Sequence, residues 1–192
     1  MKKIVALSTI ALATALAAAP ASAQSVSGTV TINGTVGEKC LVTDTGSTPN
    51  ADFGGVVNLG ALDDTDGTLR TIAAISATGD LANLGFRVVC TTANPTVSVT
   101  AAPMINVASA PAGYANRVDF TADVDFDTVG GVAEYQAVTD GTATVGGSLP
   151  NRLATGLDNV RVDLSGFNTP GAEDVLVAGS YTGSVSITIS PL

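Results

Sequence analysis

The sequence predicts an all-β fold, and more specifically an immunoglobulin-like β-sandwich. Several segments alternate apolar and polar residues with period two, which is the pattern of strands that bury one face. Turn-forming pairs that contain glycine separate these segments, and no long stretch repeats apolar residues at helical spacing. Many short strands, glycine-rich turns and a single cysteine pair together favour two packed sheets.

The predicted strands are spread along the whole chain. Only residues 69–81 favour a helix, and Gly79 together with several β-branched residues weakens that alternative. In residues 118–126 one face carries valine and phenylalanine, and the other carries an aspartate series from Asp119 to Asp127 that we expect to face solvent. The expected strands cover residues 26–36, 53–59, 84–90, 97–101, 118–126, 160–164 and 181–189.

Residues 1–23 have the features of a signal peptide. Two lysines precede an apolar run, and Ala21-Ser22-Ala23 supplies a small-x-small pattern, so cleavage is expected before Gln24. The alternative is an N-terminal membrane anchor, but the apolar run is shorter than the ~20 residues of a spanning helix. The expected segments are a signal peptide at 1–23, an N-terminal strand segment at 24–36 and one sandwich domain at 37–192.

The charge balance argues against nucleic acid as a partner. The chain has 8 basic and 17 acidic residues, and loss of Lys2 and Lys3 with the leader would change the net charge from −9 to −11. Such a chain repels phosphate backbones. Charged residues make up only 13% of the chain, which favours a protein that packs against copies of itself.

The two cysteines, Cys40 and Cys90, are predicted to form a disulfide. An exported chain meets an oxidising compartment, and each cysteine is the other's only intramolecular partner. We expect no metal at these thiols, because two ligands are too few and the chain has no histidine.

The sequence offers no catalytic residues and no cofactor site, so we do not expect an enzyme. Without histidine, neither a Ser-His-Asp nor a Cys-His arrangement can form. Two alternatives stay open: a calcium site in the acidic turn at residues 63–67, and a hydrolase that uses two carboxylates. Asn33-Gly34-Thr35 also matches the N-glycosylation sequon.

The first alternating segment, residues 26–36, is the main functional candidate. It contains neither charge nor proline, the residues that usually keep an edge strand from pairing with another chain. We interpret it as a strand that serves a second molecule, the alternative being an ordinary strand of a closed sandwich. Its apolar-face positions are Val26, Gly28, Val30, Ile32, Gly34 and Val36.

The last alternating segment, residues 181–189, is the second candidate. Its apolar row is expected to face the core, while the serines and threonines between face away. The row consists of Tyr181, Val185, Ile187 and Ile189.

In order and spacing these features resemble the pilin subunits of archaic chaperone–usher fimbriae, the group that includes spore-coat-U-like domains. The chain departs from them at its end, where Pro191 cannot donate to a strand ladder. The matching motifs are Val26-x-Gly28-x-Val30-x-Ile32 ahead of Cys40, Phe53-Gly54 with Leu59-Gly60, Phe86-Arg87-Val88-Val89-Cys90, and Ala178-Gly179-Ser180-Tyr181-Thr182-Gly183 leading into Val185-Ser186-Ile187-Thr188-Ile189.

The resemblance implies a sandwich that lacks its final strand, with an apolar groove beside the C-terminal strand. A periplasmic chaperone would lend a strand to this groove, and at an outer-membrane usher the donor strand of the next subunit would replace it. The donor would be residues 24–36. Because head-to-tail contacts do not close, copies of this chain or other pilin subunits would form a fimbria on a Gram-negative cell surface.

A second reading keeps the same fold without the fibre. The protein would be a self-contained exported β-sandwich, an adhesin or a coat protein, with the N-terminal strand folded into its own domain. Folding as a monomer without any partner would distinguish this reading from a fibre subunit.

Overall fold

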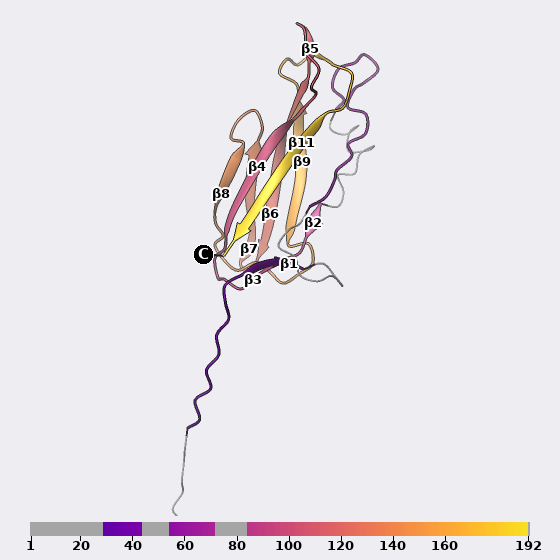
Figure 1. The fold of residues 1–192 in the computed structure, drawn as a ribbon. Helices are drawn as coiled ribbons and strands as arrows, with labels where there is room; N and C mark the ends of the chain where they lie inside the picture. Colours follow the sequence, from indigo (N-terminus) through magenta and orange to yellow (C-terminus); the bar gives the residue numbers. More distant parts are fainter. Residues whose placement is uncertain (1–28, 44–53, 72–83, 192) are drawn as a thin grey trace, which may run out of the picture. The chain divides into compact units, whose positions relative to one another are not determined.

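The computed structural model describes residues 29–43, 54–71 and 84–191. The chain divides into two units, Met1–Thr35 and Val36–Leu192. All regular structure in the described residues is strand, which confirms the all-β class (Figure 1). The strands are β1 (Cys40–Val42), β2 (Gly85–Phe86), β3 (Val88–Cys90), β4 (Thr96–Ile105), β5 (Tyr114–Ala115), β6 (Arg117–Thr128), β7 (Gly131–Val138), β8 (Thr144–Ser148), β9 (Val160–Asn168), β10 (Val175–Leu176) and β11 (Thr182–Ser190).

Seven strands of the second unit form a ladder that folds into two layers (Figure 1). One layer holds β11, β4 and β8, with β4 in the middle, and the other holds β7, β6, β9 and β2. The layers join where the end of β4 pairs with the start of β6, at Met104↔Val118 and Ile105↔Arg117. Every pair in this ladder is antiparallel, and the two layers pack as a sandwich.

The core lies between the layers, with β6 at its centre. β4 faces β6 with Val97, Val99 and Ala101, all buried. An aromatic pair closes one side, where Phe126 meets Tyr135 of β7 edge-on with ring centroids 5.7 Å apart. The inward row of β6 is buried and consists of Val118, Phe120, Ala122, Val124 and Phe126.

Four of the predicted strands are confirmed. Residues 97–101, 118–126, 160–164 and 181–189 lie in β4, β6, β9 and β11, apart from Tyr181, which stands just before β11. Clear period-two alternation marks each of them, because each buries one face against the opposite layer.

Three strand predictions are wrong in whole or in part. Residues 54–59 form no strand. The side chain of Val56 is exposed, so it does not contribute to a buried strand face. The segment at 84–90 is interrupted at Arg87, because β2 pairs with β9 whereas β3 pairs with β1. Residues 29–36, the described part of the first predicted strand, are not in a strand either.

β7 and β8 were not predicted. The inward row of β7 is Ala133, Tyr135 and Ala137, and two alanines give only a weak apolar alternation. β8 is rich in glycine, which lowers its strand propensity. Both strands form by pairing with a neighbouring strand: β7 pairs with β6, and β8 pairs with β4.

The predicted disulfide between Cys40 and Cys90 is confirmed. The two cysteines are direct cross-strand partners in the β1–β3 pair, and their Cα atoms are 4.1 Å apart. This is near the spacing of about 4.5 Å for a non-hydrogen-bonded antiparallel pair. Asn159 then fastens β3 to the main ladder: its fully buried amide accepts from Val88 N and donates to Val88 O and Ala154 O.

Candidate strand-pairing site

β11 is an edge strand. It pairs with β4 along its length, and with no other strand among those described. Every second backbone amide and carbonyl of a strand points to each side, so the outer side of β11 carries groups without a strand partner in the described part of the chain. Such an edge is a template for a further strand.

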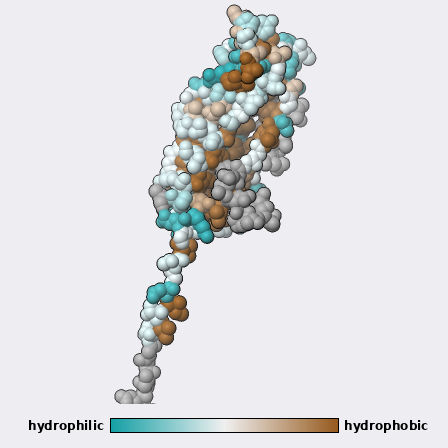
Figure 2. Space-filling model, viewed as in Figure 1, coloured by the Kyte–Doolittle hydropathy of each residue, from teal (hydrophilic) through white to brown (hydrophobic). Residues whose placement is uncertain are grey.

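The apolar row of β11 packs on the core without being fully covered. Val185, Ile187 and Ile189 stand opposite Ala101, Val99 and Val97 of β4, which are buried. The β11 residues themselves are only half-buried, while Ser184, Ser186 and Thr188 between them are exposed. The alternation is the one the sequence predicts. Half-burial beside a fully buried row leaves apolar surface that an added strand would cover (Figure 2).

The other edges of the ladder are less suited to pairing. β8 has five residues and includes Gly146 and Gly147, and β2 has two residues. β7 is eight residues long but carries Glu134. β11 has nine residues and no charge, so among the described edges it is the longest and the one without the usual protection.

Two residues fix the start of β11: Asn106, which the sequence did not single out, and Tyr181, which it placed in the apolar row. Buried Asn106 donates to Val177 O and Ala178 O, which holds the turn before the strand. The Tyr181 hydroxyl donates to Ala115 O and Val177 O, at distances of 2.8 Å and 3.0 Å. Burial raises the pKa of Tyr181, and a hydrogen bond from Asn106 opposes that rise.

A glycine permits the register change near the start of β11. The pairing with β4 shifts between Thr182 and Ser184, so Gly183 sits at a bulge. A Cβ on Gly183 would stand 2.8 Å from Met104 Cγ and 2.9 Å from Ala102 O. The Thr182-Gly183 pair was visible in the sequence, but only the paired backbone reveals why the residue there is glycine.

The predicted donor segment lies in solvent where it is described. Val30, Ile32 and Val36 are 86%, 91% and 80% exposed, and Gly34 is exposed too. Brown apolar atoms follow this stretch in Figure 2. The other two predicted positions, Val26 and Gly28, fall outside the described residues, as does the predicted signal peptide.

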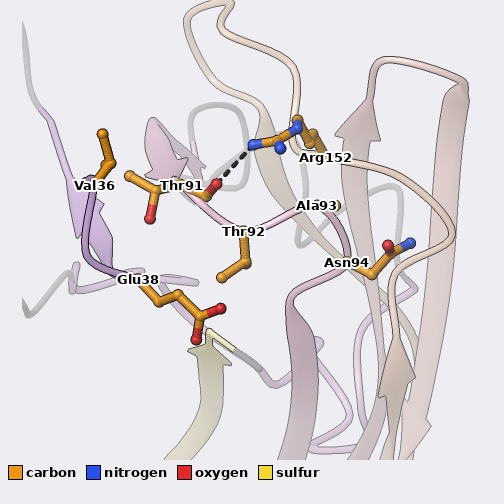
Figure 3. A pocket seen from close by; sticks show the side chains of 7 residues that line it. All are labelled: Val36, Glu38, Thr91, Thr92, Ala93, Asn94 and Arg152. Carbon is orange, nitrogen blue, oxygen red and sulfur yellow. Dashed lines mark hydrogen bonds between the residues drawn. The ribbon is translucent and has the colours of Figure 1, made fainter. Parts of the chain in front are cut away.

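A surface depression of about 370 Å³ lies beside the disulfide-bearing strands (Figure 3). Several of its polar groups bond the backbone: Arg152 donates to Thr91 O, and the Thr91 hydroxyl donates to Gly37 O and accepts from Lys39 N. The buried hydroxyl of Thr92, another lining residue, has no hydrogen-bond partner among the described residues. Asn94 donates to Leu149 O and Pro150 O. These bonds hold residues 37–39 against residues 91 and 152 at the start of the second unit. Glu38 is the one carboxylate among the lining residues, and Arg152 is the one basic residue.

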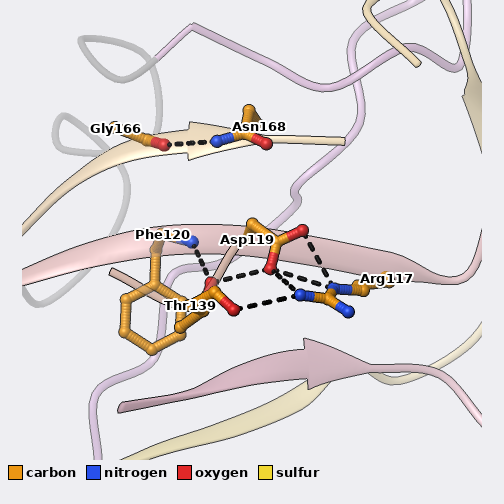
Figure 4. A network of polar contacts seen from close by, with 6 residues as sticks. All are labelled: Arg117, Asp119, Phe120, Thr139, Gly166 and Asn168. Atoms are coloured by element: carbon orange, nitrogen blue, oxygen red, sulfur yellow. Dashed lines mark hydrogen bonds and ion pairs between the residues drawn. The ribbon is translucent and has the colours of Figure 1, made fainter. Parts of the chain in front are cut away.

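The aspartate series of β6 is only partly solvated, which corrects one expectation. Asp119 is 3% exposed and accepts from Arg117 and from the Thr139 hydroxyl, and Thr139 also accepts from Phe120 N (Figure 4). Arg117 and Asp119 lie two residues apart on β6, so their side chains share one face of the strand, and Arg117 Nη2 lies 2.6 Å from Asp119 Oδ1. This network also raises the pKa of Arg117, mainly through its bonds to Asp119. The ion pair lies within β6, and the hydrogen bonds of Arg117 and Asp119 to Thr139 link β6 to the residue that follows β7.

Two carboxylates of the acidic turn at residues 63–67 accept hydrogen bonds from the turn itself and from Thr68, the next residue. Asp64 accepts from Thr65 N, and Asp66 accepts from both the amide and the hydroxyl of Thr68. These Thr68 bonds lower the pKa of Asp66. Among the residues with a described position, no three acidic or cysteine side chains gather as a metal site.

Comparisons with family models, with curated proteins and with solved structures found no match. Within the described ranges, the chain has no helix of the length and apolar character required to cross a bilayer. Function is therefore inferred from β11 and from residues 29–36 themselves.

Proposed function

We propose that this protein is a structural subunit of a surface fibre assembled by donor-strand exchange. The observation that carries the proposal is the long uncharged edge of β11, with its half-buried apolar row, in a chain that also has an exposed uncharged alternating segment. Each feature lacks what the other can supply. The outer edge of β11 lacks a strand to pair with its backbone groups, and the exposed segment lacks a sheet to cover its apolar side chains.

Burial of apolar side chains would contribute to pairing between copies of the chain, against the cost of association and of ordering the segment. Covering Val30 and Ile32 would remove apolar surface worth roughly 1.5–3 kcal/mol for each side chain. The same contact would cover Val185, Ile187 and Ile189 and satisfy the outer edge of β11 with a ladder of backbone hydrogen bonds. Neither strand carries a charge that would have to be desolvated.

The proposal includes an incomplete immunoglobulin-like domain and an export route. The leader would deliver the chain to the periplasm, where a chaperone strand would cover β11 until an usher replaces it with the segment of the next subunit. The confirmed disulfide is compatible with an oxidising compartment. Head-to-tail pairing places donor and acceptor on different molecules, so the product is a fibre with no catalytic role.

A deletion and an extension test this function. Removal of residues 24–33 should leave a domain that folds and binds the chaperone but cannot extend a fibre. Addition of the same residues to the C-terminus through a short flexible linker should give a self-complemented monomer with a higher unfolding temperature. The measurements are chaperone co-purification, electron microscopy of fibres and thermal unfolding.

The second candidate is a self-contained adhesin or coat protein. In that case the deletion would unfold the domain, because the segment would belong to its own core, and the C-terminal extension would change nothing. That pair of results would refute the fibre subunit.

A further inference from the structure

The exposed segment carries a reactive dipeptide, Asn33-Gly34, which is the only Asn-Gly pair in the chain. Both residues are exposed and neither is in a strand. No described residue hydrogen-bonds the Asn33 side chain. A Cβ built on Gly34 would meet nothing within 4 Å, so nothing in the described structure restricts the backbone nitrogen of Gly34.

The other sites with similar chemistry are restrained. The amides of Gly67 and Gly141, which follow aspartates, donate to Asp64 O and Val138 O in tight turns. Asn106 and Asn159 are buried and hydrogen-bonded, and each precedes a β-branched valine. Asn33 is thus the described asparagine whose neighbour is both small and unrestrained.

We propose that Asn33 is a site of spontaneous deamidation to isoaspartate. We also propose that this conversion makes a subunit whose donor segment stays unpaired unable to join a fibre. The second half of the proposal rests on the proposed function. The chemistry at Asn33 does not.

The reaction needs only water and a general base. The Gly34 amide gives its proton to solvent base, and its nitrogen forms a bond to Asn33 Cγ. The bond from Cγ to the side-chain nitrogen breaks, and that nitrogen takes up a proton and leaves as ammonia, which closes a succinimide ring. One water then opens the ring at either carbonyl, giving aspartate or isoaspartate.

Isoaspartate would disable the strand. Its main chain runs through Cβ and Cγ, so an extra methylene enters the backbone between the positions of Val30 and Ile32 and that of Val36. Because strand residues alternate faces with period two, one extra backbone unit shifts the later residue out of register with the earlier two. The conversion also adds a carboxylate to a chain whose net charge is already −9, which raises repulsion between copies.

Pairing would protect the same dipeptide. In a ladder the backbone of Asn33 and Gly34 is held extended and cannot reach the ring geometry. Subunits that pair soon after folding would keep Asn33 unmodified, and in subunits that stay unpaired Asn33 would be converted.

The first experiment follows the chemistry alone. The full mature chain is incubated as the unassembled protein at mildly alkaline and mildly acidic pH, and trypsin then releases residues 24–39, a peptide in which Asn33 is the only asparagine. Mass spectrometry and isoaspartyl methyltransferase labelling should show conversion at Asn33 several-fold faster than at any other asparagine, and faster at alkaline pH. Gly34→Ala should slow it several-fold. Gly37→Ala, a matched glycine with open space around its Cβ, should leave it unchanged. Equal rates at all asparagines would overturn the proposal.

The second experiment tests the consequence. After incubation, monomers and multimers of the full mature chain are separated by size, and their Asn33 peptides are compared. The modified peptide should be several-fold enriched in the monomers. The loss of multimers on ageing, measured for each protein against its own fresh sample, should be smaller for Gly34→Ala than for wild type. Equal modification in both fractions would overturn the role in pairing while leaving the reaction intact. If fresh protein forms no multimers even on usher-dependent assembly, the proposed function fails, and with it the role in pairing.

Discussion

β11 and residues 29–36 share a pattern but not an environment. Both alternate with period two, and both lack charge. β11 is paired along one side with β4, and its apolar residues are half-buried. In residues 29–36 no strand pairing is described, and Val30 and Ile32 are 86% and 91% exposed.

The difference shows what a period-two pattern specifies. It gives a segment the ability to form a strand with one apolar face, but a partner must supply the hydrogen bonds and the buried surface. β11 has one such partner, and the N-terminal segment has none in the described structure. Four changes, in descending order of expected effect, test this contrast.

Removal of the disulfide should cost the most stability while leaving the segment as it is. Replacing Cys40 and Cys90 by alanine opens a link with a sequence separation of 50, which should lower the free energy of unfolding by about 4 kcal/mol. Proteolysis within residues 29–36 under native conditions should be unchanged, because that segment is already unpaired. Denaturant unfolding and limited proteolysis measure the two effects. An unchanged unfolding free energy would show that β1 and β3 are held by other contacts.

The same substitution in the two regions should have different costs. Ile187→Asp places a carboxylate against the core, loses apolar burial and lowers strand propensity, for a loss of roughly 2–4 kcal/mol. Ile32→Asp should leave the stability of the unassembled chain within about 0.5 kcal/mol, because the side chain is in solvent. Both variants should fail to form fibres. A destabilised Ile32→Asp monomer would mean that the segment packs in its own domain.

The strands that sequence analysis predicted are those whose apolar rows are large. Valine and phenylalanine in β6 and isoleucine in β11 make the alternation visible because these strands bury one face in the core. β7 escaped prediction because its inward row includes two alanines, and its place is decided by pairing with β6. The disulfide was predictable by counting, since the chain has two cysteines.

The candidate site was predictable as a pattern but not as an edge. Nothing in residues 181–189 tells whether a strand has one neighbour or two, since that depends on contacts with β4, far away in sequence. The exposure of residues 29–36 likewise depends on which partners the chain offers. Burial of Asp119 was missed because Thr139, which bonds both Arg117 and Asp119, follows β7 and reaches them through the pairing of β6 with β7.

Two glycines provide the third test. Gly183→Ala would force a Cβ to within 2.8–2.9 Å of Met104 Cγ and Ala102 O, and such overpacking should cost about 1–3 kcal/mol. Gly34→Ala meets nothing within 4 Å and should leave the unfolding free energy of the unassembled chain unchanged. Chemical denaturation of the two variants is the measurement. Equal effects would contradict the contrast between an ordered and an unpaired strand.

The smallest expected effect concerns the anchor at the start of β11. Tyr181→Phe removes the hydrogen bonds to Ala115 O and Val177 O and should cost about 0.5–1.5 kcal/mol at neutral pH. Burial raises the pKa of Tyr181 above its ordinary value of 10.0, so the folded state favours the neutral phenol. The contribution of this group is therefore full below about pH 10 and is lost as the pH rises through the raised value of the folded state. Unfolding free energies of wild type and Tyr181→Phe should converge in that alkaline range.

Tyr114→Phe is the matched control, because Tyr114 is exposed and no hydrogen bond of its hydroxyl is described. Its unfolding curve should run parallel to that of wild type at every pH, since the variant changes no buried phenol. A Tyr181→Phe difference that stays constant through alkaline pH would mean that the phenol is equally hydrated in folded and unfolded chains. The start of β11 would then be held by Asn106 and the β4 ladder alone, and the ordered strand would differ from the unpaired one only through its pairing.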